Sequence, residues 1–254
     1  MNKIHVAGLL ATMLSVALPA AHAKELSFRA DAWCPYNCEP GKAPGYLVEI
    51  AGLALTEAGH KVDYKLMPWS DALAQVQAGR FSAAVGASVA EAPALVFPRE
   101  SLGSTQTILV TLKGRGVHAT GLKSLDGLRI GFGADYFYEE SVNAYLDAHK
   151  KEPRMVAVGG DNLTEDLIRL LVDGKVDAII EDVNVIDYQA ETKGYQGIFD
   201  YTPIGKPSSV SIGFSPADPD ARVYAALVDA KMRQLRTSGE LKKIMARYGL
   251  REPQ

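Results

Sequence analysis

A pair of adjacent carboxylates, Glu181 and Asp182, offers the clearest chemistry in the sequence. The pair follows an apolar run at 176–180, and two carboxylates that face a cleft can neutralise a cation such as an ammonium. Gly86 and Ser88 follow a similar run in the first half of the chain, where a hydroxyl can hydrogen-bond the polar groups of a ligand. The structural alternatives are a solvated turn or helix cap for the carboxylates and a local turn hydroxyl for Ser88.

Aromatic side chains follow two of the expected strands. Trp33 and Tyr36 come after the strand expected at 26–30, and Trp69 comes after the next one. A loop aromatic can stack on the apolar part of a ligand or hold a cation against its ring face. The alternative for each tryptophan is packing in the core. The sequence therefore predicts an aromatic binding wall and leaves this second role open.

Several classes of chemistry find no support in the sequence. Lys plus Arg number 27 against 30 Asp plus Glu, a net charge of −3, and no basic block occurs, so we expect no nucleic-acid partner. The segment 131–136 lacks the third glycine of a dinucleotide fingerprint. The histidines at 60, 118 and 149 lack metal-ligand spacing. We therefore expect no cofactor and no metal.

The first 23 residues have the features of a signal peptide. Lys3 precedes a mainly apolar run at 7–18, and Pro19 then leads to Ala21-His-Ala23, a small-x-small cleavage site. We expect cleavage after Ala23 and a mature protein that begins at Lys24. The alternative is a buried N-terminal helix, which the absence of an amphipathic period disfavours.

The two cysteines, Cys34 and Cys38, lie four residues apart. An exported protein permits oxidation, and a bridge that closes so short a loop would stabilise the fold by roughly 2 kcal/mol, less any strain. The spacing is not Cys-x-x-Cys, and no further ligand completes a zinc tetrahedron. A structural disulfide is the leading expectation; two free thiols and a redox-active pair are the alternatives.

Alternating strands and helices position these residues. Between residues 26 and 85 we expect strands at 26–30, 62–66 and 81–85 and helices at 46–58 and 70–78; between 129 and 180 we expect strands at 129–132, 155–158 and 176–180 and helices at 136–149 and 163–172. The pattern is typical of an α/β protein in which each lobe is a mostly parallel sheet flanked by helices. The segments 78–85 and 173–180 both run from a helix end through a glycine and a basic residue into an apolar strand, which favours two similar lobes.

Two β-branched runs, 107–111 and 209–214, are expected to cross between the lobes as hinge strands. Lobe 1 would then comprise 24–111 and 213–254, and lobe 2 the inserted segment 112–212, with closure by rotation about the two connections. Ligands of open α/β sheets bind beyond the carboxyl ends of the strands. There, Asp135 is placed to cap a helix that starts at Tyr136, whose free amides could hold an anionic group.

Six segments together are similar to the periplasmic solute-binding proteins of polar amino-acid ABC transporters, the type II two-lobe proteins that form bacterial extracellular solute-binding protein family 3. The segments are 44–51 (PGYLVEIA), 68–73 (PWSDAL), 78–86 (AGRFSAAVG), 124–131 (SLDGLRIG), 173–182 (DGKVDAIIED) and 238–249 (SGELKKIMARYG). The resemblance covers residues 26–250. It implies the type II periplasmic binding protein fold, with two lobes joined by two hinge strands.

The resemblance also implies a ligand site. The positions that match the family's amino-acid contacts are an aromatic after the first strand, the Gly-x-Ser step, the amides at 133–136 and the aspartate after the lobe 2 strand; they correspond to Trp33 or Tyr36, Gly86 with Ser88, Asp135 with Tyr136, and Asp182. One departure matters. Where the family usually has an arginine for the ligand's α-carboxylate, this chain has Pro93, and proline cannot replace a guanidinium. Arg99 is the nearest substitute in the sequence.

The resemblance implies a periplasmic protein, without enzymatic activity, that captures a small polar solute (an amino acid or a related amine or carboxylate) and delivers it to an ABC transporter permease as a monomer. Two alternatives remain. One is an exported sensing subunit for a membrane signalling protein, and the other is a dehydratase-like enzyme with Glu181 as its general acid.

Overall fold

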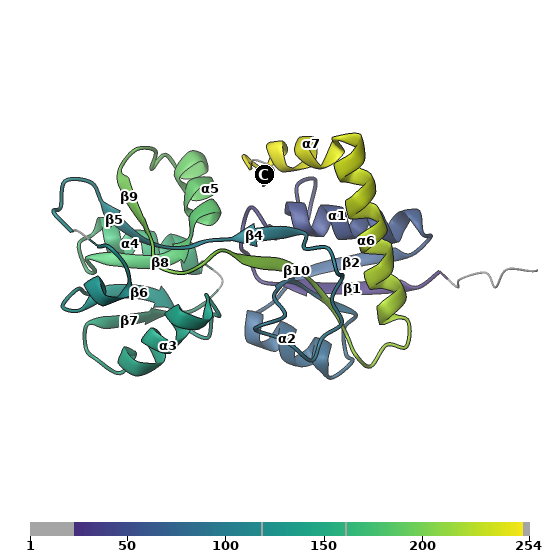
Figure 1. Ribbon diagram of the computed structural model, residues 1–254, viewed down its shortest axis with the longest axis horizontal. Helices are drawn as coiled ribbons and strands as arrows, with labels where there is room; N and C mark the ends of the chain where they lie inside the picture. Colours follow the sequence, from purple (N-terminus) through teal and green to yellow (C-terminus); the bar gives the residue numbers. More distant parts are fainter. Residues whose placement is uncertain (1–22, 118, 161, 251–254) are drawn as a thin grey trace, which may run out of the picture.

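The computed structural model describes residues 23–117, 119–160 and 162–250, which form two α/β halves side by side (Figure 1). The predicted signal peptide, residues 1–23, lies outside the described residues except for Ala23. Among the helices that the structure describes, none is long and apolar enough to span a membrane.

The first half is built on a five-stranded sheet in the order β2-β1-β3-β10-β4. Its strands are β1 (Glu25–Ala30), β2 (Lys61–Leu66), β3 (Ala83–Ala87), β4 (Gly103–Thr105) and β10 (Ser208–Phe214). β10 is antiparallel to both neighbours, so the other four strands run the same way. Its helices are α1 (Tyr46–Glu57), α2 (Trp69–Gln77), α6 (Ala221–Ser238) and α7 (Glu240–Arg247), with α2 on the opposite face of the sheet from α1 and α6 (Figure 1).

The second half repeats this plan in the order β7-β6-β8-β5-β9. The strands are β5 (Thr107–Leu112), β6 (Ile130–Gly133), β7 (Met155–Val158), β8 (Ala178–Asp182) and β9 (Phe199–Pro203). Here β5 is the reversed strand. The helices are α3 (Glu140–His149), α4 (Leu163–Val172) and α5 (Val183–Lys193), preceded by a short 3₁₀ helix, Leu122–Leu125. The expected two-lobe α/β fold with mostly co-directional strands is therefore confirmed.

The continuous apolar runs of the second sheet fill two cores, one on each face. Ile108 and Ile179 pack with α4 and α5, whereas Leu109 and Ile180 pack with α3. Successive side chains of a strand point to opposite faces, so a strand covered by helices on both sides must be apolar throughout. This explains why the runs at 107–112 and 178–180 show no regular alternation of polar and apolar residues.

The chain passes between the sheets at Gln106 and again at 204–207. β5 lies wholly in the second sheet and β10 wholly in the first, so the β-branched runs expected to cross between the lobes belong to one sheet each. We accordingly propose lobe boundaries at these connections in place of those at 111/112 and 212/213. The Gln106 side chain donates to the Gly205 carbonyl at 2.7 Å, which ties the two connections together.

The helix expected at 136–149 begins only at Glu140. Its cap is Glu139, whose carboxylate accepts from the Ser141 amide, so the expected capping role of Asp135 is wrong. Tertiary hydrogen bonds hold the preceding loop out of the helix: the Tyr138 hydroxyl accepts from the Gly133 amide at 2.7 Å and contacts the Ile180 carbonyl at 3.3 Å. The free helix amides are therefore not at Tyr136.

Candidate functional site

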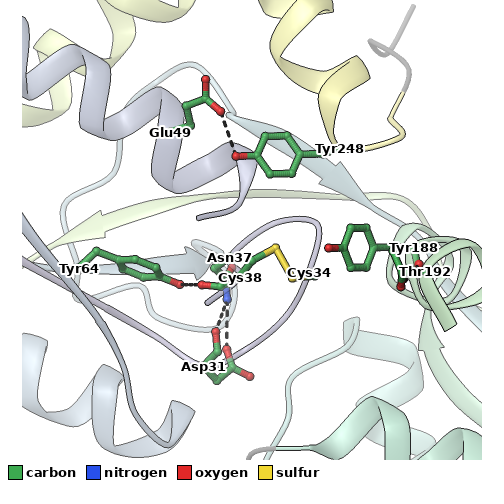
Figure 2. Close-up of a disulfide and its surroundings, with 9 residues drawn as sticks. All are labelled: Asp31, Cys34, Asn37, Cys38, Glu49, Tyr64, Tyr188, Thr192 and Tyr248. Carbon is green, nitrogen blue, oxygen red and sulfur yellow. Dashed lines mark hydrogen bonds between the residues drawn. A yellow bond between two sulfur atoms is a disulfide. The ribbon is translucent and has the colours of Figure 1, made fainter. Parts of the chain in front are cut away.

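A disulfide-closed loop follows β1 and faces the second lobe. Cys34 and Cys38 are bonded, which confirms the expected disulfide. Figure 2 shows Tyr188 of α5 beside this disulfide, and the Tyr64 hydroxyl donating to the Cys38 carbonyl at 2.7 Å. Within the loop the Trp33 amide donates to the Asn37 carbonyl at 2.7 Å. The bridge thus fixes a compact loop whose side chains reach the interface between the lobes.

Two aromatic rings of this loop meet the second lobe. Trp33 stacks on Tyr36 with ring centroids 4.2 Å apart. The Trp33 indole donates to Glu181 at 3.4 Å, and the fully buried Tyr36 hydroxyl lies 2.9 Å from an Asp182 oxygen. Asn184 donates to the same hydroxyl at 2.8 Å. The loop therefore forms the contact between lobe 1 and the carboxylate end of β8.

A cavity lies between the lobes beside this contact. Its walls come from lobe 1, including the ends of β4 and β10 next to the two connections, and from the loop before α3; the lining residues are Trp33, Gly86, Ser88, Glu91, Thr105, Phe137, Tyr138, Ser208, Ser209 and Val210. Its volume of about 30 Å³ holds only one or two water molecules. Sites for small molecules measure hundreds of Å³. A solute can enter only if the lobes separate.

Three of the residues predicted from the sequence, Trp33, Gly86 and Ser88, line this cavity together. Gly86 has φ +100°, and a Cβ there would lie 2.8 Å from the Asn37 side-chain oxygen, so a larger residue would be strained and would press on the loop. Asp135 and Tyr136 are absent from the cavity's described lining, and Tyr136 packs against the core beside α4. Their ligand-binding role remains a prediction.

Glu91, which sequence reasoning did not select, lies in the cavity wall. It accepts from the Trp69 indole at 2.7 Å, and its amide donates to the Ser88 hydroxyl at 3.2 Å. Burial raises the pKa of Glu91 to about 7. Trp69 itself is buried in a small cluster with α2 and β3, so the core-packing alternative holds for its ring while its N–H binds the carboxylate. Arg99 lies elsewhere, in a groove beside α6.

Two acceptor atoms close to this wall are buried without a partner. They are one carboxylate oxygen of Asp31 and the side-chain oxygen of Asn37. The Asn37 amide nitrogen donates to the Asp31 carbonyl at 2.7 Å (Figure 2), which leaves its oxygen turned toward Gly86. Burial raises the pKa of Asp31 to about 7. Buried acceptors without donors are costly, so the two atoms mark a place where a donor would be stabilised.

Glu181 and Asp182 are both buried, at 2% and 4% exposure, and both are hydrogen-bonded within the protein. Asp182 accepts from the Asn184 amide at 2.9 Å as the cap of α5 and from the Gln106 amide at 2.7 Å at the connection. The cap alternative is therefore correct for Asp182, and a ligand role remains a prediction. Burial raises the pKa of Asp182 to about 6.

Glu181 lies one residue earlier and points to the other side of β8. It accepts from the Thr164 hydroxyl at 3.0 Å and the Trp33 indole at 3.4 Å. Burial raises its pKa to about 7. A protonated Glu181 is compatible with this apolar setting, whereas an ionised one favours a nearby cation.

We expect Asp182→Asn to lower the free energy of unfolding by about 1 to 2 kcal/mol in the absence of any ligand. One asparagine oxygen cannot serve both the α5 cap and the Gln106 amide, and its NH₂ would face a donor. Urea unfolding measures the change, with Asp173→Asn, an exposed carboxylate after α4, as the control for charge. Wild-type stability for Asp182→Asn would show that neither contact stabilises the fold.

The described residues contain no group of three or more His, Cys, Asp or Glu side chains that could hold a metal ion. What the site does contain is a small cavity between two lobes, lined by aromatic rings, hydroxyls and the carboxyl of Glu91. This arrangement defines a two-lobed binding protein of the type II periplasmic class.

The chain belongs to the bacterial extracellular solute-binding proteins, family 3, whose profile matches residues 29–251. No curated protein sequence matches the chain. Solved structures do match in fold. A histidine kinase sensor domain with similarity to periplasmic binding proteins has a TM-score of 0.73 and 19% identity, over 90% of this chain and 97% of that one.

Two further solved structures are similar in fold. An ABC uptake transporter substrate-binding protein from Streptococcus pneumoniae, with bound histidine, has a TM-score of 0.71 and 16% identity over 88% of this chain and 92% of that one. An ancestral amino acid-binding protein that is a precursor of cyclohexadienyl dehydratase has a TM-score of 0.69 and 16% identity over 88% and 95%. At these identities the likeness establishes the fold, and the expected resemblance to the family is confirmed.

Proposed function

We propose that this protein is a periplasmic solute-binding protein that closes its two lobes around a small polar solute and delivers it to an ABC transporter permease. The observation that carries the proposal is the cavity between the lobes, to which lobe 1 contributes Trp33, Gly86 and Ser88 and lobe 2 contributes Phe137 and Tyr138. A solute bound there would contact both lobes at once. Its binding energy would favour the closed arrangement of the lobes, and a permease could recognise that closed conformation.

The two connections support this mechanism. Each is short, and they are joined by the hydrogen bond from Gln106 to Gly205, so rotation about this one place separates the lobes. The contacts that must break on opening include the Trp33–Glu181, Tyr36–Asp182 and Asn184–Tyr36 pairs and the packing of Val185 of α5 on the lobe 1 core. The proposed solute is an amino acid or a related amine or carboxylate, the proposed protein is a monomer, and export through the N-terminal signal peptide is part of the proposal.

A sensing role is the second candidate, favoured by the histidine kinase sensor domain among the structural neighbours. The same closure would then be read by a membrane signalling protein. An enzymatic role is the third, since one neighbour is a precursor of a dehydratase. Glu181, with its raised pKa, could donate a proton, but it lies behind Trp33 and Thr164 and is not in the cavity's described lining. We therefore propose binding without catalysis.

A melting-temperature screen of the exported, purified protein against amino acids, amines, carboxylates and short peptides tests the proposal. A solute at 100 times its dissociation constant adds roughly 2.7 kcal/mol of stability, which for a chain of this size raises Tm by about 5 to 10 °C. X-ray scattering should show a smaller radius of gyration with that solute. The loaded protein should stimulate the ATPase of its transporter in proteoliposomes. Consumption of the solute would instead identify an enzyme, and stimulation of a sensor kinase alone would identify a sensing subunit.

A further inference from the structure

The part of the cavity formed by lobe 1 presents acceptors of hydrogen bonds and negative charge. Glu91 lies in its wall, and Asp31 is close enough for its charge to disfavour ionisation of Glu91. The unpartnered oxygen of Asn37 lies next to Gly86, which lines the cavity, and Asn37 is bonded to Asp31, whose second carboxylate oxygen is also buried without a partner. Glu91 is therefore in the wall itself, and the oxygens of Asn37 and Asp31 lie behind it.

Positive charge is missing from this place. Among the described residues, the cavity lining contains no lysine or arginine. Arg99, Arg222 and Arg233 gather instead in the separate groove beside α6. On the lobe 2 side the Glu181 carboxyl is bonded to Trp33, which lines the cavity. A carboxylate placed here would meet the like charge of Glu91 and find no side-chain cation in the described lining.

The neighbouring rings and hydroxyls fit an organic cation better than a bare ion. Trp33, Phe137 and Tyr138 line the cavity, and an ammonium is attracted to aromatic faces as well as to carboxylates. The described residues also lack a three-ligand metal cluster. An alkylammonium donates up to three hydrogen bonds, and Glu91 supplies a charged acceptor in the cavity wall.

We propose that this site binds amines that carry no carboxylate, with the ammonium group held by Glu91 in the wall of lobe 1 and favoured by the unpartnered acceptors of Asn37 and Asp31 behind that wall. This inference rests on the proposed solute-binding function and narrows its ligand class. Decarboxylated amines are bound, and the parent amino acids are rejected because their carboxylate meets the charge of Glu91 without a partner. Selectivity then has two sources: the amine gains contacts to the site, and the amino acid brings a carboxylate that finds no positive partner there.

Calorimetry with matched pairs tests this directly: cadaverine against lysine, agmatine against arginine, and histamine against histidine, all at pH 8. We expect at least one amine to bind tenfold or more tightly than its parent amino acid. Glu91→Gln should weaken that amine at least tenfold, because the glutamine keeps the bond from Trp69 and loses the charge. Glu39→Gln, an exposed carboxylate just beyond the disulfide, removes the same charge outside the cavity and should change affinity less than twofold.

The outcomes separate the inference from the function on which it rests. An amino acid that binds more tightly than its amine overturns the inference and leaves the solute-binding function intact. The assignment to Glu91 is overturned if wild type and Glu91→Gln bind the amine equally well. An unchanged melting temperature of Glu91→Gln without amine shows that the variant is folded. If no amine, amino acid, carboxylate or peptide binds at millimolar concentration, both the inference and the solute-binding proposal fail.

Discussion

Gly45→Ala should lower the free energy of unfolding by at least about 3 kcal/mol. Gly45 has φ +99°, and an added Cβ would lie 2.3 Å from the Tyr36 carbonyl oxygen and 2.5 Å from the Asn37 Cα. Left-handed backbone costs an alanine about 1 to 2 kcal/mol, and a clash with backbone atoms cannot be relieved by turning a side chain. To make room for the methyl group, the loop would have to move away from the start of α1. That movement would break the hydrogen bond from the Leu47 amide to the Tyr36 carbonyl, which is 3.1 Å long.

Gly52→Ala is the matched control for Gly45→Ala. Gly52 lies within α1, and no atom would lie within 4 Å of its added Cβ. Replacing glycine by alanine inside a helix should raise stability by about 0.5 to 1 kcal/mol. In urea unfolding we expect the free energy of unfolding to fall for Gly45→Ala and to rise for Gly52→Ala. Similar stability for Gly45→Ala and wild type would mean that the disulfide loop is not packed on α1 as the structure has it.

The protein without solute should lose stability as the pH rises from 5 to 8, and Glu181 should account for on the order of 3 kcal/mol of the loss. Burial raises its pKa from 4.5 to about 7, so the folded chain holds the proton more tightly than the unfolded chain does. The contribution of protonated Glu181 to the free energy of unfolding is complete below pH 4.5 and is lost as the pH rises through 7. Asp31 and Glu91, whose pKa values are also raised to about 7, act in the same direction.

Glu181→Gln isolates the contribution of Glu181. The amide can accept from Trp33 and donate to the Thr164 hydroxyl, so the variant keeps the packing and loses the titration. The free energy of unfolding should change less between pH 5 and 8 for Glu181→Gln than for wild type. The two proteins should have equal stability near pH 5, and the variant should be more stable at pH 8. Parallel curves would show that Glu181 is ionised in the folded protein throughout this range.

Much of the fold follows from patterns in the sequence, because short-range physics fixes them. The glycines after α2 and α4 end those helices, and the strands that follow begin at Ala83 and Ala178, each two residues later than the sequence indicates. The residues between the end of each helix and the start of the next strand are needed to bring the chain back to the sheet. This shift moves Glu181 and Asp182 from beyond the strand into its last two positions, which is why both are buried rather than exposed.

The parts that the sequence does not reveal depend on contacts between distant segments. α5 escapes prediction because it starts with the β-branched residues of a Val-Asn-Val-Ile run, and its cap at Asp182 belongs to the preceding strand. Glu91 escapes because its partner Trp69 is 22 residues away in the chain. The buried oxygens of Asp31 and Asn37 depend on how the disulfide loop folds back on β3. Local spacing contains no signal for any of these.

The chain contains two tryptophans, and each indole N–H is bonded to a carboxyl group at the site. Trp33 reaches Glu181 across the lobe interface, whereas Trp69 reaches Glu91 within lobe 1. Tryptophan emission depends on such polar neighbours, so the tryptophan fluorescence of the protein originates beside the cavity between the lobes. Opening of the lobes would break the bond of Trp33, and ionisation of Glu91 would change the surroundings of Trp69. Replacing one tryptophan at a time by phenylalanine would therefore let solute entry and wall charge be followed separately without an added dye.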